Sequence, residues 1–410
     1  MGKLTFCRMC KRSNLVKYLD LGLTPPADKF LTEETINEPE IHYPLDVLVC
    51  TDCGQSQLGY IVPPEILYAD DYIYEMSITK MGQEHWAEFA RTVSTKLELK
   101  PNDLVIDIGS NVGVLLEEFR KNKARILGVD PASTIAKIAN DKGVETICNI
   151  FSIDLAHKIL EKYGYASVIT GTNVFAHIND LDELMKGVNI LLKEGGVFIF
   201  ESPYLVNLIN NLEYDTIYHE HLSYLSVKPL VNFFRMFGME IFNIEEKDIH
   251  GGSFRVYINR IGNRPVLPIV NKMIKKEDEI ELYSLDNLKK FASEVEKNRK
   301  ELVSLLFSLR AKGKKIAAVG APAKGMTLLN YCHIDKNLLD FATEKSKLKI
   351  GRYTPGMHFS LVSDDELIKQ HVDYALLLAW NFADEIIDNL KEYRAQGGKF
   401  IIPIPKPKII

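Results

Sequence analysis

Four of the six cysteines in this 410-residue chain form two C-x-x-C pairs. The pairs are Cys7 with Cys10 and Cys50 with Cys53, and 39 residues separate them. The two-residue spacing lets both sulfurs of a pair face one metal ion, and four thiolates bind Zn²⁺ tetrahedrally with no open position. The sequence therefore predicts a structural zinc ion. Two disulfides or a redox dithiol are the alternatives.

A second stretch, Leu104–Gly113, joins a buried-strand pattern to a glycine turn. Asp107 precedes the turn, which contains Gly109, Asn111 and Gly113. Glycines let the backbone turn sharply and approach a ligand closely. The G-x-x-x-G spacing differs from the dinucleotide fingerprint, and Asp107 disfavours a pyrophosphate but suits a cationic amino-acid ligand. We therefore expect S-adenosylmethionine (SAM) rather than NAD here, with a turn that binds nothing as the alternative.

Polar and aromatic residues recur where the following strand patterns end. Asp130 lies 23 residues after Asp107, where a carboxylate can accept both ribose hydroxyls, and Pro131 starts the next helix. Phe151 follows the expected third strand and could border an adenine. Asn173 follows the fourth strand, beside the expected methionine end of SAM. These positions together predict a SAM site, although Asp130 could instead be a surface acid.

Four polar residues stand in a row within the long segment Glu201–Ser226, which follows the fifth strand pattern: Tyr218, His219, Glu220 and His221. In an extended turn, Tyr218 and Glu220 would lie on one side and the two histidines on the other. Beside a methyl donor, these groups suggest proton abstraction. A metal site at the H-x-H motif and plain packing are the alternatives.

Strand and helix patterns alternate between residues 100 and 260. Strands are expected at 104–108, 126–129, 167–170, 197–201, 240–246 and 253–260, and helices at 112–122, 132–141, 154–162, 180–192 and 227–237. This alternation predicts a parallel sheet covered on both faces. The last two strands have no helix between them and are expected to form an antiparallel hairpin. Such a layout is that of class I SAM-dependent methyltransferases.

A second α/β unit is expected over residues 313–410. A strand at 315–319, the turn GAPAKG and a helix at 326–332 begin it, and strands at 338–343, 372–379 and 399–405 and a helix at 383–395 follow. Lys324 in the glycine-containing turn could cradle a phosphate. Glu344, Arg352 and Tyr353 add polar groups near the same strand ends. Residues 279–310 have apolar side chains at helical spacing and predict one long amphipathic helix before this unit.

Composition fits a globular protein of several domains. The chain is 46% hydrophobic and 26% charged, with a net charge of −5 and a pI near 6.1. This charge argues against a nucleic-acid surface, and no apolar run approaches the roughly 18 residues of a membrane span. The N-terminus lacks a signal-type apolar core. We expect a cytoplasmic protein with zinc-binding (1–75), methyltransferase (76–262), connecting (263–312) and C-terminal α/β (313–410) parts.

The order of these parts resembles the nucleotide-sugar C-methyltransferases over essentially the whole chain. The four-cysteine segment, the class I core, the Tyr218–His221 insert and the GAPAKG unit carry the resemblance, which is best to enzymes that methylate C-3′ of a dTDP-4-keto-deoxysugar. It implies a Rossmann-like SAM core flanked by a zinc domain and a C-terminal Rossmann-like domain. It also implies that the C-terminal domain helps to hold the nucleotide sugar, which suits Lys324, Glu344, Arg352 and Tyr353.

The resemblance further implies roles for individual residues. His221 matches the general base, and the other matched residues of the pocket are Tyr72, His177, Tyr218 and Glu220. In the implied reaction, His221 removes a proton made acidic by the neighbouring ketone, and the enolate carbon then takes the methyl group from the sulfonium of SAM. An O- or N-methyltransferase, a zinc-containing binding module and a nicotinamide-dependent oxidoreductase remain alternatives. We expect a monomer or a weak homo-oligomer.

Overall fold

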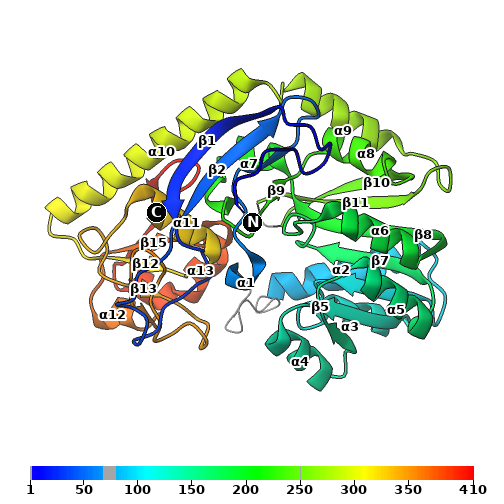
Figure 1. Cartoon of the computed structure of the whole chain (residues 1–410). Helices are drawn as coiled ribbons and strands as arrows, with labels where there is room; N and C mark the ends of the chain where they lie inside the picture. Colours follow the sequence, from blue (N-terminus) through cyan, green and yellow to red (C-terminus); the bar gives the residue numbers. More distant parts are fainter. Residues whose placement is uncertain (1, 68–79, 250) are drawn as a thin grey trace.

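The structure of the chain is a computed structural model that describes residues 2–67, 80–249 and 251–410 (Figure 1). Two α/β bodies, one cyan to green and one orange to red, lie on either side of the blue N-terminal strands (Figure 1). The long yellow helix α10 runs beside the first of these strands. No helix in the described part is both long and apolar enough to cross a membrane.

The larger body is built on a seven-stranded sheet with the order β10-β11-β8-β7-β4-β5-β6. Its strands are β4 (Leu104–Ile108), β5 (Arg125–Asp130), β6 (Thr146–Cys148), β7 (Ala166–Thr172), β8 (Leu192–Pro203), β10 (Met239–Lys247) and β11 (Ser253–Arg260). The first five are parallel to one another, whereas β11 is antiparallel to both β8 and β10. The predicted parallel sheet with a terminal antiparallel hairpin is confirmed.

Helices cover both faces of this sheet. Successive side chains of a strand point to opposite faces, and the apolar side chains on both faces of the central strand need to be buried. Every residue of β4 is buried; Ile106 packs in one apolar cluster and Val105 in another. The helices are α2 (Lys80–Lys96), α3 (Val114–Lys121), α4 (Ser133–Asp141), α5 (Ile153–Tyr163), α6 (Leu181–Leu191) and α8 (Val227–Arg235). Ser152 and Asp180 cap α5 and α6 by accepting from Leu155 N and Glu183 N, which fixes where these helices begin.

The N-terminal sheet includes a strand from far along the chain. Its order is β1-β2-β3-β9, formed by β1 (Leu15–Thr24), β2 (Tyr43–Cys50), β3 (Ser56–Leu58) and β9 (Ser223–Tyr224). The last strand belongs to the insert after β8, together with α7 (Leu205–Asn210) and the 3₁₀ turn η1 (Tyr214–Thr216). Helix α1 (Pro64–Leu67) follows the N-terminal strands. The zinc segment and the Tyr218–His221 insert therefore share one sheet.

The connection between the two α/β bodies contains two helices, so the expectation of a single helix over 279–310 is wrong at its start. Helix α9 (Pro268–Glu279) ends where that helix was expected to begin, and α10 (Leu285–Ala311) follows a turn. In this turn Glu281 has a φ of 50° and Tyr283 packs against Gly54. The apolar spacing runs through Leu282 and Leu285, so periodicity could not show the break.

The smaller body has the sheet order β14-β13-β12-β15-β16-β17, parallel except for the last strand. Its elements are β12 (Ile316–Val319), α11 (Ala323–Cys332), β13 (Ala342–Thr343), β14 (Leu361–Val362), α12 (Glu366–Lys369), β15 (Tyr374–Leu377), η2 (Trp380–Phe382), α13 (Ala383–Asn389), α14 (Lys391–Ala395), β16 (Lys399–Ile402) and β17 (Lys408–Ile409). The strand expected at 338–343 is only two residues long, because the preceding residues form turns. The helix expected at 383–395 is divided at Leu390, which is buried.

Candidate active site and zinc centre

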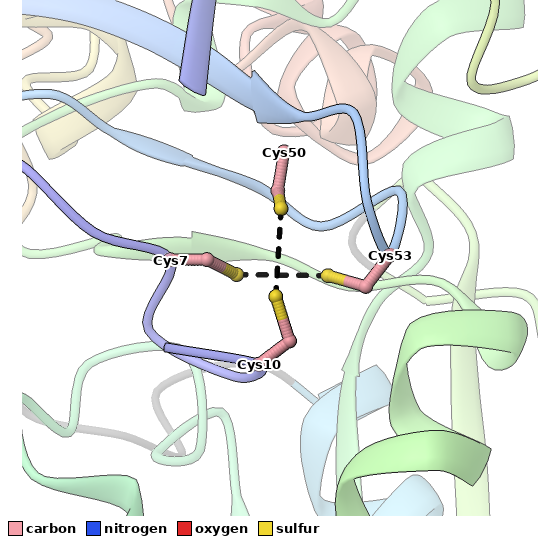
Figure 2. Close-up of side chains that lie close together, drawn as sticks. All are labelled: Cys7, Cys10, Cys50 and Cys53. Carbon is pink, nitrogen blue, oxygen red and sulfur yellow. Dashed lines mark hydrogen bonds between the residues drawn. The ribbon is translucent and has the colours of Figure 1, made fainter. Parts of the chain in front are cut away.

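The four cysteine sulfurs converge on one point, as Figure 2 shows. The Sγ atoms of Cys7 and Cys53 are 3.6 Å apart, those of Cys10 and Cys50 are 3.5 Å apart, and all four lie within 4.8 Å of one another. Four ligands about 2.3 Å from a tetrahedral zinc ion lie about 3.8 Å from one another. The cluster fits zinc, and its sulfurs are too far apart for disulfide bonds.

Each knuckle is closed by the backbone of its own turn. Lys11 N donates to Cys7 O at 3.0 Å, and Gly54 N donates to Cys50 O at 2.8 Å. Gly54 has a φ of +85°, and a Cβ at this position would lie 2.5 Å from the Tyr283 ring. A glycine is therefore needed both for the backbone conformation and for the packing of the connecting turn.

The glycine turn after β4 has the shape needed for close ligand approach. Gly109 has a φ of +69°, and a Cβ there would lie 2.3 Å from Val174 Cγ2. Gly113 and Asn111 also have positive φ angles, so the chain turns twice before α3 begins. The turn is held because Asn111 N donates to Asp130 Oδ2 at 2.9 Å. The structure thus brings Asp107, Gly109, Asn111, Gly113 and Asp130 to one edge of the sheet.

Asp107 and Asp130 are buried acids whose hydrogen-bond donors are all neutral. Asp107 is 2% exposed and accepts a hydrogen bond from Thr170 Oγ1 at 2.6 Å. Burial raises the pKa of Asp107 to about 7, and Asp130 adds to this effect. Burial also raises the pKa of Asp130, although the hydrogen bonds from Asn111 N and Ala132 N lower it. A cationic ligand would relieve the cost of ionising Asp107.

The other predicted donor residues lie at the same strand ends but differ in what they offer. Asn173 follows β7 with a φ of 56°, and its N donates to Glu201 O at 2.7 Å. Pro131 is exposed directly after β5. Phe151 is buried against Gly187 of α6, whereas its neighbour Ile150 is 65% exposed. Sequence reasoning missed Ile150 because exposure within a loop leaves no pattern.

The expected alternation of side chains over residues 218–221 is wrong. His221 N donates to Tyr218 O at 2.9 Å, which closes a turn and brings the first and fourth residues to the same side. The Tyr218 hydroxyl lies 2.8 Å from His221 Nε2, and His221 Nδ1 lies 2.8 Å from Thr216 O. A carbonyl oxygen can only accept, so Nδ1 carries the proton and Nε2 accepts from the phenol.

His177 completes a pair of histidine rings. The ring centroids of His177 and His221 are 4.8 Å apart and the planes are nearly perpendicular. Burial and the neighbouring His221 lower the pKa of His177 well below its usual value, so its ring is neutral. The two loops are tied together because Leu222 N and Ser223 N both donate to Ala176 O. Three predicted residues, Tyr218, His221 and His177, therefore meet.

Glu220 and His219 point into different surroundings. Glu220 is 2% exposed, and in the described part its carboxyl oxygens form no hydrogen bond of normal geometry. Burial raises its pKa to about 8, with a further contribution from Asp28, whose carboxylate lies 3.8 Å from Lys349 Nζ. His219 packs edge-on against Tyr43, and burial lowers its pKa to about 4. Sequence reasoning missed Asp28, which no motif marks.

The predicted nucleotide residues are spread over the smaller body and its neighbours. Lys324 lies 4.7 Å from the centre of the Trp380 ring and donates to Asn381. Burial lowers its pKa, and Asp215 and Glu213 from the insert raise it. Asp215 in turn accepts from Trp380 Nε1 at 2.6 Å. The turn at Lys324 thus faces the insert, through contacts that no local pattern could predict.

Glu344, Arg352 and Tyr353 have separate partners. Glu344 accepts from Ala321 N at 3.0 Å, so an acid at the end of β13 holds the turn after β12, as Asp130 holds the turn after β4. Arg352 is half-buried and its backbone oxygen accepts from Leu361 N. Tyr353 pairs by two backbone hydrogen bonds with Leu31 of the N-terminal part.

Tyr72 lies outside the described residues. Among the residues that the structure does describe, the four cysteines are the only converging group of three or more potential metal ligands. Within these residues, His219 and His221 belong to no such group.

Family models match three consecutive parts of the chain. A zinc binding domain matches residues 7–68, a methyltransferase domain matches residues 81–244, and a C-methyltransferase C-terminal domain matches residues 248–405. The C-methyltransferase NovU of Streptomyces niveus is 36% identical over 405 residues, which cover 98% of this chain and 96% of NovU.

More distant similarities cover less than half of the chain. The sterol 4-C-methyltransferase strm-1 of Caenorhabditis elegans is 30% identical over 133 residues, or 32% of this chain and 38% of that protein. Among solved structures, a SAM-dependent methyltransferase from Clostridium acetobutylicum is 17% identical, with a TM-score of 0.34, covering 44% of this chain and 92% of that one.

Proposed function

The chain belongs to the family of SAM-dependent C-methyltransferases with an N-terminal zinc-binding domain, and we propose that its acceptor is a nucleotide-linked 4-keto-deoxysugar. The carbon to be methylated lies next to the ketone, with C-3′ of a dTDP-sugar as the specific candidate. A ketone makes the neighbouring C–H acidic because the resulting charge spreads onto its oxygen. Such an acceptor requires a base and a hydrogen-bond donor, and the chain offers both.

The observation that carries the proposal is the environment of His221. With Nδ1 donating to Thr216 O, the lone pair of Nε2 is the basic site of the ring. The Tyr218 hydroxyl lies 2.8 Å from this nitrogen and indicates the direction from which a proton reaches it. The neighbouring His177 is neutral, so it does not oppose the positive charge that His221 gains.

In the proposed reaction, His221 Nε2 removes the proton and an enolate forms on the sugar. For this step the Tyr218 hydroxyl first turns from Nε2 to the ketone oxygen, because Nε2 has a single lone pair, and Tyr72 or His177 adds a second hydrogen bond. The enolate carbon then takes the methyl group from SAM, and S-adenosylhomocysteine leaves. Burial raises the pKa of Glu220 to about 8, and in its protonated form it would donate to the ketone oxygen. Each preorganised donor at such an oxyanion contributes about 3–4 kcal/mol.

The donor would be held at the turn after β4. SAM supplies an electrophilic methyl group on a sulfonium ion. Asp107 would face the cationic methionine end beside Asn173, and Asp130 would accept the ribose hydroxyls. Ile150 is a better candidate than Phe151 for the apolar edge of the adenine, because Phe151 is buried against Gly187.

The acceptor's nucleotide would lie against the C-terminal body. Glu344 holds the turn at Ala321, and this acid-and-turn pair resembles the one at Asp130. Lys324 would contribute its positive charge to the phosphates, and Arg352 and Tyr353 would add contacts from the loop beyond. Because Lys324 also faces Asp215 of the insert, nucleotide binding and the position of the insert would be linked.

The substitution His221→Asn tests the base. We expect turnover to fall by roughly two to four orders of magnitude, while SAM binding stays unchanged. In D₂O without SAM, the unmodified protein should exchange the acidified proton of the 4-keto sugar nucleotide, and the variant should not. His219→Asn is the matched control, because His219 packs against Tyr43. Near-normal turnover of His221→Asn would reassign the base, and methylation of a reduced 4-hydroxy acceptor would favour O-methylation.

A further inference from the structure

Arg8 lies inside the first zinc knuckle, between Cys7 and Cys10, and its side chain contacts residues outside the zinc segment. The residue is 4% exposed. Its backbone N donates to Gln57 Oε1 at 2.8 Å, and Gln57 Nε2 donates to Phe6 O at 3.2 Å. Strand β3 therefore fixes the knuckle at the point where the Arg8 side chain leaves it.

The guanidinium of Arg8 bridges the two loops that carry the histidine pair. Nε donates to Ser223 Oγ at 3.2 Å, two residues after His221. Nη1 donates to Asn179 Oδ1 at 3.1 Å, and Nη2 donates to Asn179 O at 3.0 Å and to Ile178 O. Four acceptors are thus bound in the planar geometry that only arginine offers.

The charge of Arg8 fits this position beside the metal. The hydrogen-bond partners of its guanidinium are all neutral, and Asp180 acts on it only through space. A buried cation needs a nearby negative charge. Four thiolates around Zn²⁺ carry a net charge of about −2. The metal cluster and Asp180 together therefore supply the counter-charge that lets a guanidinium stay buried between the two loops.

We propose that Arg8 is a positioning residue that couples the zinc cluster to the spacing of His177 and His221. This inference rests on the proposed function of these histidines. The ring centroids are 4.8 Å apart. The guanidinium binds the residues that follow each histidine in the chain, within two positions of it. A displacement of about 1 Å at a reacting group can cost roughly 100-fold in rate, so the bridge should affect the chemical step.

The test compares Arg8→Met and Arg8→Lys with Lys11→Met in the full-length protein. Lys11 is a matched control in the same knuckle: it binds Asp182 of the larger body and donates to Arg8 O, and its side-chain contacts within the described residues do not include the histidine loops. For Arg8→Met we expect one zinc per chain, a roughly 10- to 100-fold lower kcat and KM values within about threefold. Arg8→Lys should recover only part of the loss, because an ammonium cannot bind all four acceptors.

Hydrogen–deuterium exchange separates positioning from general destabilisation. In Arg8→Met, and in the unmodified protein after zinc removal, peptides covering residues 174–180 and 216–224 should exchange faster, whereas peptides covering β4 and β5 should not. Lys11→Met should leave both regions unchanged. Uniformly faster exchange, or an unchanged kcat in Arg8→Met, would overturn the proposal.

A second variant approaches the same contacts from the other side. The double substitution Ser223→Ala and Asn179→Ala removes two acceptors without touching the knuckle, and kcat should again fall while KM stays. An unaltered kcat in this variant counts against positioning by Arg8. If His221→Asn is active but Arg8→Met is not, the assignment of His221 as the base is wrong, whereas the positioning role of Arg8 is supported.

Discussion

At the scale of single residues, the glycine turn after β4 could be predicted because its requirements are local. Asp107, Gly109 and Asp130 lie where a strand pattern ends, and the carboxyl ends of parallel strands meet at one edge of a sheet. The contact between Tyr218 and His221 could not be predicted in the same way. The residue types of this segment are compatible with both a turn and an extended conformation. Only the structure, through the hydrogen bond from His221 N to Tyr218 O, shows that the segment is a turn.

We predict that Asp107 makes SAM binding dependent on pH. Its pKa of about 7 in the ligand-free protein means that it is largely protonated below that pH. A cationic ligand favours the ionised form, so binding below pH 7 must release a proton, and affinity should weaken up to about tenfold per pH unit below 7. Above pH 7 the affinity should level off. Calorimetric titration with SAM between pH 5.5 and 8.5 measures this change.

The control for this pH dependence is Asp107→Asn, which keeps an oxygen for Thr170. Its SAM affinity should be weaker at pH 8 and nearly independent of pH. Asp103→Asn, at an acid bound to Lys193 near the opposite end of β4, should keep the slope of the unmodified protein. A flat profile in the unmodified protein would show that Asp107 does not face the cation.

At the scale of elements, periodic patterns predicted the strands and helices of the methyltransferase body, where each face of the sheet is buried. The patterns did not predict elements that form because segments distant in the sequence contact each other. Strand β9 is two residues long and exists because β3 offers it a partner. The break before α10 places Tyr283 over Gly54, although Leu282 and Leu285 maintain the helical spacing. Neither feature has a local cause.

Gly54 connects the second zinc knuckle to that break. Gly54→Ala should destabilise the protein, because a left-handed backbone costs about 1–2 kcal/mol for alanine and the new methyl group meets the Tyr283 ring. We expect a lower melting temperature and faster zinc loss to a chelator. In a Tyr283→Ala background, Gly54→Ala should lower the stability less, because only the cost of the left-handed backbone remains. An equal cost in both backgrounds would contradict the packing argument.

At the scale of the whole molecule, the insert after β8 lies between all three parts. Its strand β9 joins the zinc sheet, Tyr218 and His221 meet His177 of the methyltransferase body, and Asp215 faces Lys324 of the C-terminal body. The sequence indicated three parts in order but not that they converge on one segment. Contacts between residues more than a hundred positions apart leave no pattern in a single sequence.

This arrangement predicts that zinc removal separates the two halves of the reaction. The sheet β1-β2-β3-β9 holds the residues that follow His221, so loss of zinc should loosen the acceptor half. The turn after β4 is held by hydrogen bonds to β5 and by Asp130, and none of these involves the zinc sheet. SAM binding should therefore persist within about threefold, while methyl transfer falls at least tenfold, a change of at least about 1.4 kcal/mol in the barrier.

The measurement pairs calorimetric SAM binding with turnover before and after chelation, and again after zinc is restored. Restored turnover excludes irreversible unfolding as the cause. A parallel loss of both quantities would mean that the zinc domain supports the whole methyltransferase body. Unchanged turnover without zinc would mean that β9 holds its place without the metal. The expected separation follows from topology. The residues proposed to bind SAM lie at the ends of the central strands of the larger sheet, whereas the residues proposed to act on the sugar lie in a segment that completes the zinc sheet.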